Sequence, residues 1–372
     1  MPDLSTTLAG IPLSTCLFNA SGPRSGSAEA LAKVAASSGA GAVLSKSSTL
    51  SAQTGNPQPR TWHGDVASLN SEGLPNKGID YYIDPETVRE ASGDYSKPYL
   101  VSLSGKTLAD NLTMLQKIVD SPASKIAAIE LNLACPNVIG KPIIAYDLDQ
   151  LKDILQQVSQ FVQKHPTLPP LGIKLPPYLD FVVLGQVAQL LNQHASTIRF
   201  VTAINTLGNA MAVQGKCPTV KSNHGYAGLS GPAVHYTALA NVRKLRELLD
   251  ERLEIVAVGG VQSGADALAF LLCGAQAVQV GTTHWKEGAG CFERIAEELQ
   301  QVLRANGYES VEAARGQLQE WSRDGMGKSE RTTTTSKASS SSRELQFYQF
   351  LSALLAILLA VAVAHVPLLP SE

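Results

Sequence analysis

A thiol lies between two carboxamides in residues 130–137 (ELNLACPN), directly after an apolar run. Cys135 can act as a general base if its pKa, about 8.5 for a free cysteine, is matched to the reaction. Asn132 and Asn137 each offer donors and an acceptor, which suits a planar ring bearing C=O and N–H groups. A buried cysteine beside a proline turn is the alternative interpretation, and these eight residues alone do not decide between the two.

Length, charge and cysteine usage limit the class of protein. The 372 residues suit one large domain with additions, because α/β barrels run to about 250 residues or more. A net charge of -2 does not suggest a nucleic-acid-binding protein, which would need a basic stripe on its surface. The five cysteines form no CxxC pairs, which argues against a disulfide framework or a metal site and favours a reducing compartment. The first ten residues lack the regions of a secretory signal.

Eight short apolar segments are expected to be buried parallel strands. They are residues 15–19, 41–45, 98–103, 127–133, 171–175, 199–205, 254–258 and 277–281. Helical patterns lie between many of them, at 28–37, 108–118, 149–162, 237–249 and 265–272. This alternation predicts a TIM (β/α)8 barrel, with a doubly wound open sheet as the alternative.

Polar and small residues follow most of these strands. The series is Asn19-Ala20-Ser21-Gly22, Ser45-Lys46-Ser47, Ser102 with Ser104, Asn132, Lys174, Asn205-Thr206, Gly259-Gly260 and Gly281-Thr282. In a barrel these strand ends converge on one face, where active sites are built. Two lysines and three asparagines at such positions favour a functional site over a structural explanation.

Small-residue turns in the last three units indicate a phosphate site. They are GLSG at 228–231, VGG at 258–260 and VGT at 280–282. Backbone N–H groups in such turns can hold a phosphate, and barrels often bind one after strands seven and eight. The alternative is that these are tight turns that need glycine for a positive φ.

Two connections, residues 47–97 and 209–227, are long for a compact domain. Such loops are usually functional and often act as lids, although a surface excursion without a role is the alternative.

Nine motifs in a fixed order resemble those of the dihydroorotate dehydrogenases, over about residues 4–320, and within them the soluble, fumarate-linked class. They are NASG (19–22), SKSST (45–49), GNP (55–57), NSEGLPN (70–76), NLACPN (132–137), KLPPY (174–178), NTLGN (205–209), TALANVR (237–243) and LLCGA (271–275). A cysteine rather than a serine as the base is typical of this class.

The resemblance implies oxidation of dihydroorotate to orotate in pyrimidine synthesis, with FMN as cofactor and fumarate, reduced to succinate, as the electron acceptor. Cys135 would remove a proton from C5 while hydride leaves C6, and Lys46 is the second implied catalytic residue. The implied substrate-binding residues are Lys46, Asn70, Gly73, Leu74, Asn132, Asn137, Asn205 and Thr206. The implied cofactor-binding residues are Ala20, Ser21, Gly22, Lys46, Ser47, Asn132, Lys174, Ile204, Gly231, Gly259, Gly260, Gly281 and Thr282. A homodimer is implied as well.

The chain departs from the family pattern at several positions. Glu72 stands where the family usually has Met, in the loop over the substrate, and a carboxylate there would repel an anion unless it points outward. Ala134 replaces a serine, His235-Tyr236 replaces a Lys-Pro pair, and the 226–231 loop has fewer glycines than usual. Glu72 favours the alternative of a related FMN barrel acting on another cyclic pyrimidine or ene-carbonyl. A non-enzymatic FMN barrel and a flavin-free phosphosugar barrel are weaker alternatives.

The C-terminal composition differs from that of the predicted barrel, residues 1–321. Residues 322–344 include a Ser/Thr tract and are expected to be a disordered linker. Residues 345–371 contain no Asp, Glu, Lys or Arg, and about 20 apolar residues span a bilayer core. Residues 345–369 are therefore a candidate transmembrane tail anchor, with the barrel facing the cytosol. An amphipathic or buried helix and a wrongly predicted exon are the alternatives. A quinone acceptor is conceivable for a membrane enzyme, but the quinone-linked class has N-terminal membrane helices and a serine base.

Overall fold

The computed structural model describes residues 1–134 and 143–322. The chain divides into two compact units, Met1–Leu318 and Gln319–Glu372, and the elements given below belong to the first. Cys135, Asn137, the linker from residue 323 onward and the predicted tail helix at 345–369 lie outside the described residues. Within the described ranges, no helix is both long and apolar enough to cross a membrane.

In the described part of the chain, eight parallel strands form one sheet in the order β3-β16-β15-β10-β9-β8-β7-β4. Their bounds are β3 Leu17–Asn19, β4 Val43–Leu44, β7 Tyr99–Leu103, β8 Ala128–Asn132, β9 Leu171–Leu175, β10 Ile198–Ala203, β15 Glu254–Val258 and β16 Ala277–Val280. A parallel bridge between Phe18 and Ala42 brings the two edges together, so the sheet is a nearly closed barrel. All eight predicted strands are present, and the predicted barrel is confirmed over the open sheet.

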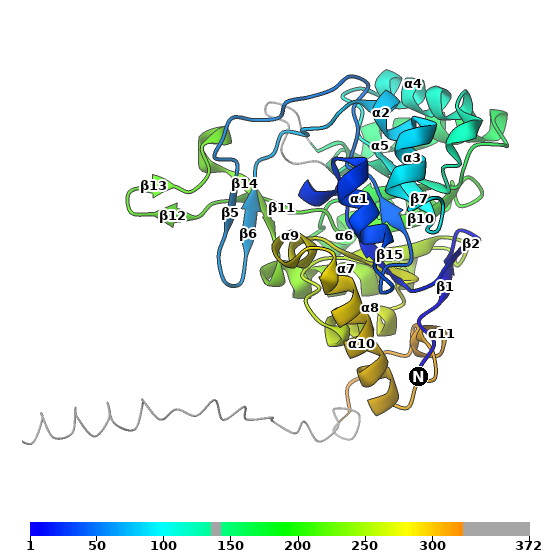
Figure 1. Ribbon diagram of the computed structural model, residues 1–372, viewed down its shortest axis with the longest axis vertical. Helices are drawn as coiled ribbons and strands as arrows, with labels where there is room; N and C mark the ends of the chain where they lie inside the picture. Colours follow the sequence, from blue (N-terminus) through cyan, green and yellow to red (C-terminus); the bar gives the residue numbers. More distant parts are fainter. Residues whose placement is uncertain (135–142, 323–372) are drawn as a thin grey trace, which may run out of the picture. The chain divides into compact units, whose positions relative to one another are not determined.

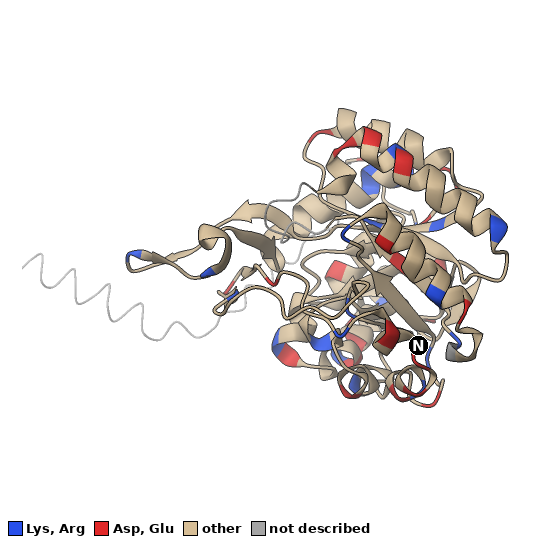
Figure 2. Cartoon of the chain, turned by 90° about the horizontal axis from the view of Figure 1, so that it is seen from above, with Lys and Arg blue, Asp and Glu red and all other residues tan. Residues whose placement is uncertain are grey.

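Helices alternate with the strands and cover the outside of the barrel (Figure 1). The helices are α1 Ala28–Ala35, α2 Ile79–Ile83, α3 Pro85–Ala91, α4 Leu108–Val119, α5 Leu148–Lys164, α6 Phe181–Asn192, α7 His235–Leu248, α8 Gly264–Leu272, α9 Thr282–Glu287, α10 Gly290–Ala305 and α11 Val311–Ala314. Capping boxes begin α4, at Thr107 and Asp110, and α8, at Ser263 and Asp266. Figure 2 shows Lys and Arg interspersed with Asp and Glu along the outer helices.

The two long connections build a second, antiparallel sheet beside the barrel (Figure 1). Its order is β11 Leu207–Ala210, β14 Ala227–Ser230, β6 Ser68–Asn70 and β5 Thr61–His63. A short hairpin, β12 Val213–Gln214 with β13 Cys217–Pro218, extends from it. Asn70 and Gly228 are partners in this sheet, so it joins segments far apart in the sequence. Both connections therefore contribute strands to this sheet.

The interior of the barrel is apolar toward the amino ends of the strands. The hairpin of β1 Thr6–Leu8 and β2 Ile11–Leu13 contributes Leu8 and Leu13 to a cluster with Phe18, Phe200 and other buried side chains. Gly172 makes room for this packing, because a Cβ atom there would lie 2.2 Å from the Phe200 ring. Side chains two residues further along these strands also point into the barrel, one layer nearer the carboxyl ends of the strands. That next layer is polar and lies below the site.

Candidate functional site

A cleft lies at the carboxyl ends of the barrel strands and contains all but one of the predicted site residues that the structure describes. The predicted residues that line it are Ala20, Ser21, Gly22, Lys46, Ser47, Asn70, Leu74, Asn132, Lys174, Ile204, Asn205, Thr206, Gly231, Gly259, Gly260, Gly281 and Thr282. The exception is Gly73, where a Cβ atom would lie 2.5 Å from the side chain of Asn56. Its φ of +69° indicates a turning role.

Asn132, the last residue of β8, is the centre of the polar network in this cleft. Its Nδ2 donates to Ser47 Oγ (3.1 Å), and its Oδ1 accepts from Ala134 N (3.1 Å) and from Asn205 Nδ2 (3.1 Å). These contacts fix the plane of the Asn132 amide and the position of the Ala134 N–H group. The network fixes two amide groups that line the cleft, and amides of this kind can bind a ring that has C=O and N–H groups.

Hydroxyl groups extend this network across the strand ends. Ser47 Oγ lies 2.9 Å from Ser102 Oγ and 3.1 Å from Ser21 Oγ. Thr206 Oγ1 is buried and has no hydrogen-bond partner among the described residues. Because buried polar atoms are rarely left unpaired, this hydroxyl is a candidate ligand contact.

A buried ionic network lies directly below the cleft. Lys174 Nζ is 3.5 Å from Glu130 Oε1 and donates to Gln279 Oε1 (3.2 Å). The other carboxylate oxygen, Oε2, accepts from Thr202 Oγ1 (2.9 Å) and Gln279 Nε2 (2.7 Å). The Glu130 side chain is 0% exposed and that of Lys174 is 5% exposed. Four strands therefore fix the ammonium group of Lys174 at the floor of the cleft.

Glycines and hydroxyls form the far end of the cleft, at β14, β15 and β16. Gly231 and Gly260 have φ values of +84° and +68°, so the requirement for glycine in these turns is partly conformational. Thr282 Oγ1 donates to Ser230 Oγ (3.0 Å), which joins two of the predicted phosphate turns. Residues of all three turns line the cleft.

Several residues of the site were not predicted from the sequence. Glu130 and Gln279 each interrupt an apolar strand, and a charged or amide side chain within such a run was the signal that could have found them. Trp285 lines the cleft, and its ring packs edge-on against His63 with the centroids 4.2 Å apart. Glu72, which the sequence analysis noted as a departure in the loop over the substrate, also lines the cleft, but its partner Arg60 was not predicted.

His284, next to Trp285 in α9, makes stability depend on pH. It is 4% exposed, and burial, with the charge of Arg24 as a smaller cause, lowers its pKa to about 4 from the usual 6.5. The unfolded chain therefore binds a proton between these pH values that the folded chain does not. The contribution of neutral His284 is complete above pH 6.5 and is lost as the pH falls toward 4, at up to about 1.4 kcal/mol per pH unit.

We expect His284→Gln to flatten this dependence. Urea unfolding of the variant should show a free energy of unfolding that falls less steeply than that of the wild type between pH 6.5 and 4, with parallel curves above pH 7. Identical slopes below pH 6.5 would contradict the assignment to His284.

Comparison with known proteins identifies the family. A family model described as "Dihydroorotate dehydrogenase" matches residues 3–303. A relative from Lachancea kluyveri named "Dihydroorotate dehydrogenase (fumarate)" is 43% identical over 281 residues, which is 75% of this chain and 87% of the relative. One from Lactococcus lactis subsp. cremoris named "Dihydroorotate dehydrogenase A (fumarate)" is 40% identical over 317 residues, or 85% and 99%. A crystal structure of the Eimeria tenella DHODH in complex with ferulenol has a TM-score of 0.70 at 22% identity, covering 85% of this chain and 88% of that one, and supports the fold.

Proposed function

The chain belongs to the dihydroorotate dehydrogenase family, and we propose that it oxidises (S)-dihydroorotate to orotate, with FMN as its cofactor and fumarate as the terminal acceptor. The observation that carries the proposal is the single cleft that brings together Asn70, Asn132, Asn205 and two lysines. This donor set suits a ring with two carbonyl groups, N–H groups and a carboxylate.

The residues of the cleft also fit FMN. The glycine and hydroxyl turns at Gly231, Gly260 and Thr282 would hold the phosphate, and Lys174 would face the polar edge of the ring system. When bound, FMN supplies the acceptor for the two electrons taken from the substrate. The Glu130–Lys174 network offers that acceptor a fixed cation.

The chain's own residues would orient the substrate and move one proton. Asn132 and Asn205, already fixed to each other, would hold the ring, and Lys46 would attract the carboxylate. Cys135 would take the proton from C5. This role rests on the family resemblance and on Ala134, whose N–H donates to Asn132 Oδ1 one residue before Cys135.

An anaerobic titration of the purified full chain tests cofactor, substrate and acceptor together. We expect a yellow protein whose flavin absorbance bleaches on addition of dihydroorotate and recovers with fumarate but not with a quinone. A yellow protein that dihydroorotate does not bleach would contradict the substrate and favour another cyclic pyrimidine. A colourless protein that cannot bind added FMN would contradict the cofactor.

The membrane tail anchor at residues 345–369 and the homodimer stay part of the proposal. The apolar composition of the tail supports the anchor, and the family resemblance supports the dimer. Recovery of the full chain in a carbonate-resistant membrane fraction is the result expected of an anchor, whereas recovery in the supernatant contradicts it. Sedimentation should give twice the chain mass if the dimer forms.

A further inference from the structure

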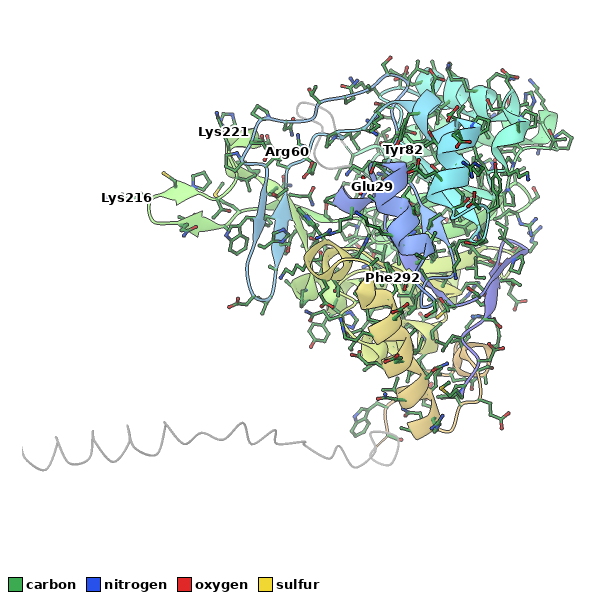
Figure 3. The ribbon with its side chains drawn as sticks, viewed as in Figure 1. Glu29, Arg60, Tyr82, Lys216, Lys221 and Phe292 are labelled. Atoms are coloured by element: carbon green, nitrogen blue, oxygen red, sulfur yellow. The ribbon has the colours of Figure 1, made fainter. Side chains whose placement is uncertain are left out.

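Glu72 is a carboxylate in a cleft built for anions, and the structure shows what accompanies it. Arg60 Nε lies 3.0 Å from Glu72 Oε2, with side-chain exposures of 17% and 13%. Glu72 lines the cleft, whereas Arg60 does not. Arg60 directly precedes β5 and lies near the second sheet (Figure 3). The guanidinium group therefore neutralises Glu72 from behind the cleft wall.

The surrounding loop holds this pair in place. Arg60 Nη1 donates to Thr54 O (2.9 Å) and Asn56 O (3.1 Å), while Asn56 N donates to Glu72 O (2.9 Å). Asn56 Nδ2 also donates to Ser71 O (2.9 Å). The two segments on either side of β5 and β6 are thus fastened together. Arg60 cannot swing away from Glu72 without giving up its backbone contacts.

The pair matters because few charges line the cleft. Among its described lining residues the ionisable side chains are Lys46, Lys174 and Glu72. Glu130 neutralises Lys174 from below, and Arg60 neutralises Glu72 from outside. The net charge that a ligand meets therefore depends on both ion pairs. Of the two, only the Arg60–Glu72 pair has its negative group in the cleft wall.

We propose that the Arg60–Glu72 pair sets how the cleft discriminates between ligands by charge, and in particular between a ring with one carboxylate and an acceptor with two. This inference rests on the proposed function, which supplies orotate and fumarate as the two ligands. An intact pair is electrostatically close to neutral. Removing Arg60 exposes ligands to a negative wall, whereas removing the charge of Glu72 exposes them to a positive one. A change in the field at the wall acts on each ligand charge.

The size of the effect follows from Coulomb's law. One uncompensated charge at a partly solvated wall changes the affinity for a singly charged ligand by about fivefold. The interaction energy is proportional to ligand charge, so fumarate should change by about the square of that factor, about 25-fold. Salt should reduce both shifts, because the Debye length falls to about 3 Å at 1 M ionic strength. If the pair had only a structural role, the loss of affinity would depend neither on the charge of the ligand nor on the salt concentration.

The experiment measures dissociation constants of orotate and fumarate for the oxidised, FMN-loaded full chain, by calorimetry at low and high salt. The variants are Arg60→Gln, Glu72→Gln and the double variant. Glu72→Gln keeps the shape of the side chain, so it tests the proposal even if Arg60→Gln loosens the loop. Lys221→Gln is the matched control, because Lys221 is exposed and its backbone N–H donates to Pro59 O next to Arg60 (Figure 3).

We expect Arg60→Gln to weaken orotate about fivefold and fumarate about 25-fold, and Glu72→Gln to strengthen both in the same proportion. The double variant should stay within about twofold of the wild type, because it removes both charges of the pair. Lys221→Gln should stay within the same range, because one exposed charge contributes little. Equal, salt-independent losses for both ligands, or no change in Glu72→Gln, would overturn the inference. If the wild type binds neither ligand, the proposed function fails instead.

Discussion

Replacing Cys135 with alanine should slow the bleaching of the flavin by dihydroorotate by about two to four orders of magnitude, the range that general acid–base catalysis contributes. The proposed role of the thiol is to accept the C5 proton, and alanine offers no acceptor. Asn132 and Asn205 remain fixed to each other in the variant, so the ring should still be bound. The measurement is anaerobic stopped-flow absorbance with the flavin content of each sample determined beforehand.

The pH dependence distinguishes loss of a base from damage to the site. In the wild type the bleaching rate should rise with pH as the thiol ionises, and in Cys135→Ala this rise should be absent. Cys217→Ala is the control, because Cys217 is an exposed free thiol in β13 and should leave the rate unchanged. Cys135→Ala with wild-type rates, or with the wild-type pH profile, would refute the base assignment.

Strand positions were predictable because burial on both faces leaves a plain signal. The predicted bounds of β9 and β15 agree with the structure at both ends, because each strand is followed by a residue that cannot continue the sheet. The turns after β15 and β16 were predictable because their residue types also give a local signal. Glycine and polar side chains at the end of a strand are a local property, and local properties can be read from a single sequence.

The polar layer and the second sheet depend on contacts that no local pattern encodes. Glu130 and Gln279 are 149 residues apart, and the sequence around either residue does not indicate which barrel strand its side chain will contact. The β6–β14 pairing involves strands of three and four residues, too short for alternation to be recognised. Glu72 was noticed as a departure, but its partner Arg60 is twelve residues away in irregular chain, without helical or strand periodicity.

The second large effect concerns the buried pair below the cleft. Lys174→Met leaves Glu130, which is 0% exposed, without a compensating charge, and removing one partner of a buried pair costs about 3–5 kcal/mol. Glu130→Gln strands the lysine in the same way, although the glutamine can still accept from Thr202 and Gln279. Each single variant of the flavin-free protein should therefore unfold at much lower urea concentration than the wild type.

The double variant separates charge compensation from packing. Glu130→Gln with Lys174→Met removes both charges and keeps an amide where Thr202 and Gln279 donate, so it should lose less stability than the sum of the two single variants. Lys33→Met, in the exposed pair with Glu29 on α1 (Figure 3), should leave the urea midpoint nearly unchanged. Additive losses in the double variant would contradict coupling between Glu130 and Lys174.

The midpoint potential of the flavin tests whether this buried pair acts on the cofactor as well as on stability. A cation at the polar edge of the cofactor favours the reduced, anionic flavin, so Lys174→Met should lower the midpoint potential of the FMN-loaded protein. Glu130→Gln should instead raise the potential, because it leaves the charge of Lys174 uncompensated, even though it lowers stability as Lys174→Met does. Stability and potential would thus respond differently to the same two substitutions. If the potential instead followed the stability, Lys174 would act only as a structural partner of Glu130.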